Sequence, residues 1–469
     1  MQLSEATIRE IVKQVTARLQ PTDSTGVFPT MQQAISAAKQ AGQTVRSLSI
    51  NKREKIISGI RAATLQNSEI LSRMAVEETG MGNIPHKILK HNLVAEKTPG
   101  TEDIRTVAWS GDNGLTLVEM SPFGVIGAIT PSTNPAETII CNTIGMLAGG
   151  NTVVFNPHPA AVRTSVFAVE MINRAAQTAC GISNIATTVD APSLESGKIM
   201  MSHPDIALLV ATGGPGLVDA VLKSGKRGIG AGAGNPPVLV DETADLQKAA
   251  LHIINGATFD NNLPCIAEKA IVAVEEIADE LMRFMVNENC YHATAAEIAK
   301  LEKVVFVTDT RADNVHNERS IPKALNRNCV GKSAADLLKI IGITANARCI
   351  VFEGEKEHPF IAEELMMPIL GMVRTRDFAA AVETSLWLEH GYRHSAHIHS
   401  KNVDRITNYA KTLDTAILVK NAPSYAALGF GGEGFCTFTI ASRTGEGLTS
   451  AATFTKQRRC VMSESLCIR

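Results

Sequence analysis

The feature that most constrains the fold is an alternation of short apolar runs with glycine- or proline-containing loops between Ser121 and Val240. The runs in this stretch cover residues 125–129, 152–155 and 206–210. Each run is short and is followed by a loop and a segment with helical spacing of its apolar positions. This pattern is typical of βαβ units, whose strands are parallel and whose connections are helices. We therefore expect a parallel sheet covered by helices.

A second alternation of the same kind follows and indicates a second α/β domain. After a helical stretch at 246–256, apolar runs cover residues 270–274, 349–352 and 416–419. A chain of 469 residues is long enough for two such domains. Only 4% of the residues are aromatic, which favours helices packed closely on parallel sheets over an all-β sandwich. We place the boundary between the two domains near residues 230–240.

The charge balance and the cysteines exclude several classes of protein. A formal net charge of -2 gives no field that would attract nucleic acid or an acidic membrane. No stretch approaches the roughly 20 apolar residues of a membrane span, and the N-terminus lacks the features of a secretion signal. The 9 cysteines are scattered without a CxxC pair, so we expect reduced thiols. We therefore expect a cytoplasmic protein, or one held in a compartment inside the cytoplasm.

Residues 1–20 predict a short amphipathic helix that a linker at 21–30 separates from the remainder of the chain. The apolar residues that fall on one helical stripe are Ile8, Ile11, Val12, Val15 and Leu19. Ser4 is a candidate N-cap of this helix. The stripe needs a partner, which can be the chain's own domain or subunit, or another protein to which the helix docks. The pattern alone leaves both alternatives open.

Two glycine-rich segments are candidates for ligand contact. Thr212, Gly213 and Gly214 follow the apolar run at 206–210, and such a turn lets backbone N–H groups approach phosphates at the start of a helix. The segment is not GxGxxG, so a tight turn without a ligand is the alternative. Residues 228–237 contain glycines at alternate positions and no charge, which indicates backbone that faces a ligand or packs very tightly.

Cys265 lies in a polar, proline-containing loop directly before an apolar run. A lone cysteine is most often a small buried hydrophobe, so the loop by itself only makes Cys265 a candidate nucleophile. His394, His397 and His399 are candidate metal ligands, but carboxylate partners are not evident near them. We therefore expect no metal site.

From about residue 27 onward, the order of these segments resembles the aldehyde dehydrogenase superfamily. The segment TPSTNP at 130–135 is similar to the motif whose asparagine, here Asn134, helps form the oxyanion hole. Cys265 matches the catalytic nucleophile, and TGG at 212–214 matches the turn near the cofactor phosphates. EELMMP at 363–368 matches the segment whose glutamate, here Glu364, holds the nicotinamide ribose. The resemblance implies a Rossmann-like cofactor domain, an α/β catalytic domain and a small oligomerisation arm.

The resemblance also implies domain limits and cofactor contacts. It places the NAD-binding domain at 31–104 and 124–235, the catalytic domain at 236–436, and oligomerisation elements at 105–123 and 437–469. The residues that it implies as NAD contacts are Thr130, Pro131, Ser132, Pro157, His158, Thr212, Gly213, Gly214 and Glu364.

Two departures from the superfamily pattern are similar to one branch of it. Hydrolytic members carry a glutamate that activates water, and the corresponding position here is Ala231 or Gly232, without a carboxylate. The lysine that usually contacts the adenine ribose is replaced by Asn156. Both changes are similar to the branch that transfers the acyl group to coenzyme A. The resemblance therefore implies that NAD accepts a hydride and that coenzyme A takes the acyl group from a Cys265 thioester.

Within that branch, the chain is similar to enzymes of the bacterial microcompartments that degrade 1,2-propanediol. The motifs that carry this likeness are TGMGN (79–83), SPFGVIG (121–127), PSTNPxETII (131–140), TGGPG (212–216), GAGAGNPP (230–237), NLPCIAEK (262–269) and GGEGF (431–435). The likeness implies propionaldehyde as the substrate, with acetaldehyde, as in ethanolamine utilisation, as the alternative. It also implies that residues 1–20 are an encapsulation peptide that binds a shell protein. We therefore expect a homo-oligomer, a dimer or tetramer, in the lumen of a microcompartment, without nucleic-acid or membrane partners.

Overall fold

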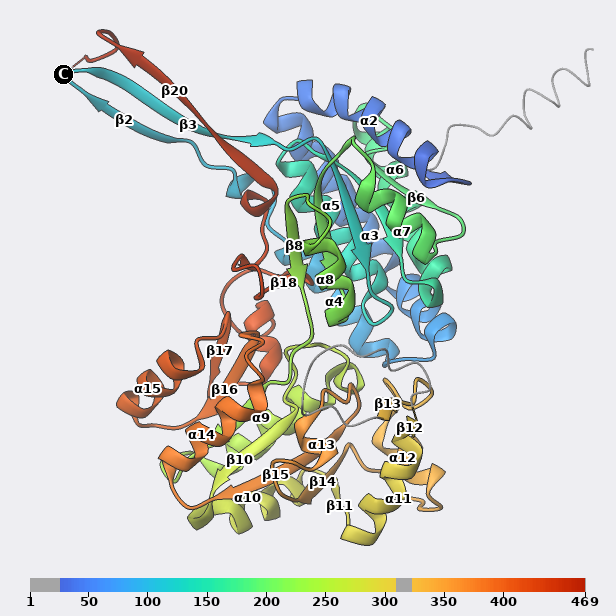
Figure 1. Cartoon of the computed structure of the whole chain (residues 1–469), viewed down its shortest axis with the longest axis vertical. Helices are drawn as coiled ribbons and strands as arrows, with labels where there is room; N and C mark the ends of the chain where they lie inside the picture. Colours follow the sequence, from blue (N-terminus) through green and yellow to red (C-terminus); the bar gives the residue numbers. More distant parts are fainter. Residues whose placement is uncertain (1–25, 309–322, 469) are drawn as a thin grey trace, which may run out of the picture.

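The computed structural model describes residues 26–308 and 323–468. Figure 1 shows two α/β bodies, one above the other, and a long arm of β-strands that extends from the upper body. The predicted amphipathic helix at 1–20 and the first half of the predicted linker lie outside the described residues. Within the described part of the chain, no helix is long and apolar enough to span a bilayer.

The upper body contains a six-stranded sheet in the order β1-β6-β5-β4-β7-β8, in which all neighbouring strands are parallel. Its strands are β1 (Val27–Phe28), β4 (Val125–Thr130), β5 (Thr152–Pro157), β6 (Ala186–Val189), β7 (Ile206–Thr212) and β8 (Gly228–Ala231). Every position of β4 and β5 is buried, because helices cover both faces of the sheet. Such strands read as continuous apolar runs in the sequence, and the predicted strands at 125–129, 152–155 and 206–210 are confirmed.

Helices pack on the two faces of this sheet. They are α2 (Met31–Ser47), α3 (Ile50–Thr79), α4 (Ile84–Lys97), α5 (Pro135–Ala148), α6 (Val162–Cys180), α7 (Leu194–Ser202) and α8 (Pro215–Leu222). Val125 and Ile129 of β4 pack in one apolar cluster with residues of α2 and α7. Ile126 and Ala128 pack in another with residues of α5 and α6, since successive side chains of a strand point to opposite faces.

The order of the sheet reverses at β4. The chain continues from β4 to β5 and β6 on one side, and then returns to place β7 and β8 on the other. Ligands of open α/β sheets bind beyond the carboxyl ends of the strands at such a reversal. The fold therefore predicts a site at the loops that follow β4 and β7, which carry residues 131–134 and 213–214.

The lower body contains a seven-stranded sheet in the order β11-β14-β15-β10-β9-β16-β17, again parallel throughout. Its strands are β9 (Pro237–Val240), β10 (Ala270–Val274), β11 (Cys290–His292), β14 (Cys349–Glu353), β15 (Ile369–Thr375), β16 (Ser395–His399) and β17 (Ile417–Lys420), and a hairpin of β12 (Phe306–Thr308) and β13 (Lys323–Leu325) accompanies them. Its helices are α9 (Leu246–Thr258), α10 (Glu275–Asn287), α11 (Ala295–Val305), α12 (Ala334–Ile340), α13 (Pro359–Ala362), α14 (Phe378–Glu389) and α15 (Val403–Leu413). The last strand of the upper sheet along the chain is β8, and the first strand of the lower sheet is β9, so the chain passes from one sheet to the other between Ala231 and Pro237.

The arm is an antiparallel sheet of β2 (Val107–Gly111), β3 (Gly114–Pro122) and β20 (Thr455–Ser463), with β3 in the centre (Figure 1). Its first two strands match the predicted segment at 105–123.

Two of the predicted boundaries differ from the structure. In the segment 437–469, the short strands β18 (Ile440–Ala441) and β19 (Gly447–Leu448) precede the arm, and Ile440 and Phe454 pack in the core of the upper body. The arm therefore begins only at Thr455. Strand β1 lies within the predicted linker at 21–30 and pairs with β6, so the cofactor domain begins earlier than predicted. Both errors have one cause, because a strand of two residues has no periodicity by which a sequence could reveal it.

Candidate active site

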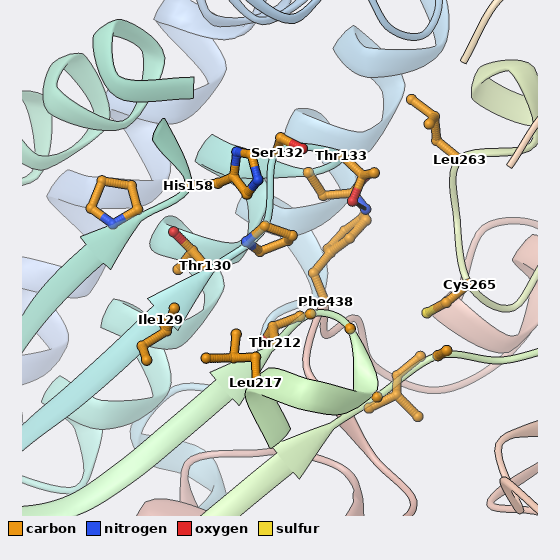
Figure 2. A pocket seen from close by; sticks show the side chains of 18 of the residues that line it. Ile129, Thr130, Ser132, Thr133, His158, Thr212, Leu217, Leu263, Cys265 and Phe438 are labelled. Atoms are coloured by element: carbon orange, nitrogen blue, oxygen red, sulfur yellow. Dashed lines mark hydrogen bonds between the residues drawn. The ribbon is translucent and has the colours of Figure 1, made fainter. Parts of the chain in front are cut away.

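A cavity of about 500 Å³ lies where the carboxyl ends of β4, β5 and β7 face the loop at 263–266. All eleven residues that the sequence predicts for the site line this cavity: Thr130, Pro131, Ser132, Asn134, Pro157, His158, Thr212, Gly213, Gly214, Cys265 and Glu364. Figure 2 shows the Cys265 side chain on its loop, across the cavity from Thr130, Ser132 and His158. The fold thus brings segments from both domains to one place.

Several apolar residues of the cavity wall were not predicted. They are Leu194, Met201, Leu217, Leu263, Met366, Leu428, Phe438 and Ile440. They come from segments on both sides of the domain boundary, among them α7, α8 and β18, and single apolar side chains in such segments carry no signal in a sequence that marks a cavity wall. They give the cavity a largely apolar wall, which is typical of sites for small organic ligands.

The cofactor end of the cavity is formed by the turn between β7 and α8. A Cβ added at Gly214 would meet nothing within 4 Å, so this backbone faces open space. Helix α8 begins at Pro215, and Gly214 in the N-cap position offers no side-chain capping bond. Neither Gly213 nor Gly214 has a positive φ. The turn therefore needs glycine to leave its backbone accessible, and not to adopt its conformation. This is the arrangement that lets a phosphate approach the start of a helix.

Asn156, which replaces the lysine of the superfamily pattern, is occupied within the protein. Its Oδ1 accepts a bond of 2.6 Å from the Ser196 hydroxyl, and its Nδ2 donates to the Ser193 carbonyl oxygen at 3.2 Å. These bonds join the end of β5 to the first turn of α7. Asn156 lines the cavity as part of its frame, with both ends of its amide already bonded.

The loop that carries Cys265 has an unusual backbone. Asp260, Asn261 and Asn262 have φ values of 48°, 54° and 65°, a left-handed region that Asp and Asn tolerate better than other side chains. Asn262 Nδ2 holds the loop by donating to the carbonyl oxygens of Ala257 and Glu268, at 2.8 and 3.0 Å. The buried ammonium of Lys269 adds a bond of 2.6 Å to Asn262 Oδ1. The polar residues around Cys265 therefore fix the position of the thiol.

Close packing against the Cys265 loop explains Gly234, one of the glycines that alternate along residues 228–234. A Cβ at Gly234 would come within 2.9 Å of both the Cys265 carbonyl oxygen and the His394 ring. Gly232 is different, since it lines the cavity and a Cβ there would meet nothing within 4 Å. Ala231 is buried in β8 and does not line the cavity. Of the two positions that match the missing water-activating glutamate, only Gly232 therefore faces the nucleophile's cavity.

The Cys265 thiol and the nearby Glu364 carboxyl group hold their protons more tightly than usual. Burial raises the pKa of the Cys265 thiol to about 12, and the Glu364 carboxylate adds to this shift while Lys269 opposes it. Burial also raises the pKa of Glu364 to about 7, although Lys269 at 4.0 Å works in the other direction. Cys265 is therefore a thiol at neutral pH until a bound ligand or a base changes its surroundings.

Behind Asn134 lies a cluster of buried charges that the sequence analysis did not predict. Lys90 Nζ lies 2.5 Å from Asp260 Oδ2 and 3.0 Å from Glu137 Oε1, and Lys87 Nζ lies 3.1 Å from the same oxygen of Asp260. The side chains of all four are at most 1% exposed. Lysines of a helix ordinarily read as surface residues, so no signal in the sequence distinguishes these two.

The three candidate metal ligands are buried in β16 or directly before it. His397 Nε2 lies 2.8 Å from the carbonyl oxygen of Ile266, and His394 Nδ1 lies 2.9 Å from the Ser395 hydroxyl. Burial lowers the pKa of His394 and His397 to about 4, and that of His399 to about 3. Over residues 26–308 and 323–468, no three or more His, Cys, Asp or Glu side chains group as metal ligands would.

The chain belongs to the aldehyde dehydrogenase family, whose model matches residues 13–450. It is 45% identical over 470 residues to a propanal dehydrogenase (CoA-propanoylating) from Citrobacter freundii, and the match covers 99% of each protein. The structure of a propionaldehyde dehydrogenase from the Clostridium phytofermentans fucose utilisation bacterial microcompartment is 70% identical, with a TM-score of 0.91 over 95% of this chain and 100% of that one. A propionaldehyde dehydrogenase from Rhodopseudomonas palustris, with bound CoA and an acylated cysteine, is 51% identical, with the same TM-score and coverage.

Proposed function

We propose that this protein is a coenzyme-A-acylating aldehyde dehydrogenase that oxidises propionaldehyde, with NAD, to propionyl-CoA and NADH. The observation that carries the proposal is the cavity in which Cys265 and Asn134 meet, while no carboxylate stands at Ala231 or Gly232. The names of the relatives support the substrate and the acyl acceptor, since one is called CoA-propanoylating and another holds CoA and an acylated cysteine.

The cavity fits NAD at the end formed by β4 and β7. The open backbone at Gly214 leaves space for a pyrophosphate, and the buried Thr130 hydroxyl, which has no hydrogen-bond partner among the described residues, is available to the ligand. Glu364 lines the same cavity and is suited to hold a ribose hydroxyl. When bound, NAD supplies the acceptor for a hydride.

In the first half of the reaction, the Cys265 sulfur attacks the aldehyde carbonyl carbon. The carbonyl oxygen gains negative charge, and the Asn134 amide N–H donates to it. A donor aimed at the charge that develops in a transition state contributes about 3 kcal/mol. Loss of the aldehyde hydrogen as hydride leaves an acyl group in thioester linkage to Cys265.

In the second half, the acyl group passes from Cys265 to the thiol of coenzyme A, and Cys265 is regenerated. Water competes for the same thioester. A positioned general base accelerates such a step by about 100- to 10,000-fold, and among residues 26–308 and 323–468 none lies within 4 Å of a Cβ placed at Gly232. The cavity therefore favours transfer to the thiol over hydrolysis.

The direct test is product analysis with propionaldehyde, NAD and coenzyme A. We expect propionyl-CoA and NADH in equal amounts, and less NADH when coenzyme A is omitted. Cys265→Ala should abolish NADH formation while NAD binding, measured by fluorescence, stays nearly intact. NADH formation by the variant would refute the role of Cys265, and free propionate as the main product would refute the acylating function. Rates over a series of straight-chain aldehydes separate propionaldehyde from acetaldehyde as the preferred substrate.

For the arm, we propose a contact between subunits of a dimer or tetramer.

For residues 1–20, we propose docking on a microcompartment shell protein. The apolar stripe of the predicted helix supports this docking, and a relative from a microcompartment supports a location inside one. An isolated helix of this length is marginal in water, so it needs a docking surface. Deletion of residues 1–20 should leave kcat and KM unchanged but release the enzyme from compartments. If the truncated enzyme dissociates or unfolds, the helix belongs to its own oligomer.

A further inference from the structure

Lys90 of helix α4 is a fully buried lysine that touches the side chain of Asn134. Its Nζ lies 2.5 Å from Asn134 Oδ1, as well as 2.5 Å from Asp260 Oδ2 and 3.0 Å from Glu137 Oε1. Its side chain is 0% exposed. The three partners come from the start of α5 and from the loop before Cys265, so this one ammonium joins the two segments on which the proposed chemistry takes place.

The chemistry of an ammonium group determines which way the Asn134 amide points. An ammonium only donates hydrogen bonds, so the atom of Asn134 that faces it must be the oxygen. The amide nitrogen must then point away from Lys90. Its one bond within the described residues is a long one, 3.4 Å to the Thr133 hydroxyl. The N–H groups are therefore left for an acceptor in the cavity that Asn134 lines.

The position of Asn134 in its helix supports the same conclusion. Asn134 is the N-cap residue of α5, and asparagine is among the best side chains for capping a helix. Here the side chain makes no capping bond. The amide is instead held by Lys90, which in turn pairs with Glu137 in the first turn of the same helix. The Asn134 side chain thus bonds to Lys90 of α4 instead of to the backbone N–H groups at the start of its own helix.

Two buried carboxyl groups surround the Lys90 ammonium. Lys90 is paired with both Asp260 and Glu137, and Lys87 is paired with Asp260. Burial alone would lower the pKa of Lys90, but Asp260 and Glu137 outweigh burial and raise it. Lys90 therefore remains an ammonium at neutral pH.

We propose that Lys90 is a positioning residue of the reaction: its ammonium fixes and polarises the Asn134 amide so that the amide N–H meets the oxyanion formed on Cys265. A hydrogen bond accepted at the amide oxygen strengthens the amide as a donor, because chained hydrogen bonds polarise one another. Lys90 acts only through Asn134 and does not touch the substrate. This inference rests on the proposed oxyanion role of Asn134.

The experiment is a double-mutant cycle on the full-length enzyme. Lys90→Met, Asn134→Ala and the combined variant are compared by kcat/KM for propionaldehyde at saturating NAD and coenzyme A. Lys87→Met is the matched control, since Lys87 is equally buried and shares Asp260 but does not contact the Asn134 side chain.

We expect Asn134→Ala to lose about 100- to 1,000-fold and Lys90→Met about 10- to 100-fold, with the Kd for NAD unchanged. In the Asn134→Ala background, Lys90→Met should cost less than threefold more, because there is no amide left to position. Lys87→Met should stay within threefold of the parent enzyme. If Lys90→Met does not fold, the same cycle is run with Lys90→Gln, whose amide can still donate to Asn134 and should retain more activity than a non-donor.

The outcomes separate the two proposals. If Asn134→Ala loses less than threefold, the oxyanion role of Asn134 itself is wrong. If Asn134→Ala behaves as expected but the loss from the Lys90 variant is fully retained in the Asn134→Ala background, Lys90 supports the fold and does not position the amide. Equal losses from Lys87→Met and Lys90→Met would overturn the inference as well.

Discussion

The pKa values of the buried carboxyl groups are shifted in opposite directions on the two walls of the cavity. On the wall that carries Asn134, Glu137 is completely buried, and burial would raise its pKa; Lys90, with smaller contributions from His91 and Lys87, instead lowers the pKa to about 2. On the wall that carries Cys265, burial raises the pKa of Glu268 and of Glu364 to about 7. Hydrogen bonds, among them those from Ser424, offset part of the rise at Glu268, and Lys269 offsets part of it at Glu364. Glu137 on one wall therefore stays ionised at neutral pH, while Glu268 and Glu364 on the other wall exchange protons near neutral pH.

The difference corresponds to what each wall must do. An amide that meets an oxyanion must keep one orientation throughout the reaction, and the pair of Lys90, whose pKa is raised, with Glu137, whose pKa is lowered to about 2, can provide that. A thiol that attacks, becomes acylated and is released must change its protonation and charge in each cycle. Groups with a pKa near 7 allow such changes at little cost. The two walls meet at Asp260, which pairs with Lys90 and lies in the loop that leads to Cys265.

Glu137→Gln should have the largest effect on stability. A pKa of about 2 in the folded state, against about 4.5 when unfolded, contributes roughly 3 kcal/mol above pH 4.5, which is lost as the pH falls towards 2. We therefore expect the variant to lose roughly 3 kcal/mol at pH 7 and less at pH 3.5. Urea unfolding at the two pH values measures this, and equal losses at both would show that the charge of Glu137 is not what stabilises the fold.

Glu268→Gln should act in the opposite direction. Since the pKa of Glu268 is raised to about 7, the wild-type protein loses stability as the pH rises from about 4.5 through 7. Its Oε1 accepts from the Ser424 N–H at 2.9 Å, and its Oε2 has no partner among the described residues. We expect the variant to gain roughly 3 kcal/mol relative to wild type at pH 8, and less than about 1 kcal/mol at pH 5. The midpoints of urea unfolding at the two pH values measure this difference. If the variant is less stable than wild type at pH 8, the proposed contrast between the two walls is wrong.

The contrast itself could not be predicted from the sequence. Lys90 and Asp260 are separated by 170 positions, and only the fold shows that they pair. A lysine between Leu89 and His91 reads as an exposed residue of a helix, because buried lysines are rare without partners. The longer apolar strands, such as β4, β7 and β10, were by contrast predictable, since helices on both faces favour apolar side chains along the whole strand, whereas a two-residue strand such as β1 was not. The site residues were found through motif resemblance, while spacing alone had left Cys265 and the 212–214 turn open.

The reactivity of Cys265 provides a smaller test of the titrating wall. With the pKa of the thiol raised to about 12, the thiolate fraction should increase about tenfold for each pH unit between 6 and 8. Alkylation of the ligand-free enzyme by iodoacetamide should follow the same slope. The Cys265 peptide is quantified by mass spectrometry, because Cys460, which is exposed, reacts too and serves as an internal comparison. A rate that levels off below pH 7 would mean that the thiol is already ionised, contrary to its buried surroundings.

The smallest expected effect comes from restoring a carboxylate to the titrating wall. Gly232→Glu places one in open space beside the cavity, at a position whose φ does not require glycine. A carboxylate that activates water should increase the share of free propionate among the products by at least a few-fold, although far below the 100- to 10,000-fold of a well-positioned base. Product ratios at limiting coenzyme A measure the change.

Ala231→Glu is the control, because Ala231 is buried in β8 and does not line the cavity. It should destabilise the protein without changing the ratio of propionate to propionyl-CoA, since a charge forced into the sheet cannot reach the thioester. If Gly232→Glu also leaves the ratio unchanged while the enzyme stays active, the absence of a base is not what suppresses hydrolysis. Exclusion of water by the apolar wall of Leu263, Leu428 and Phe438 would then be the cause, and polar substitutions there, rather than a new carboxylate, should release free acid.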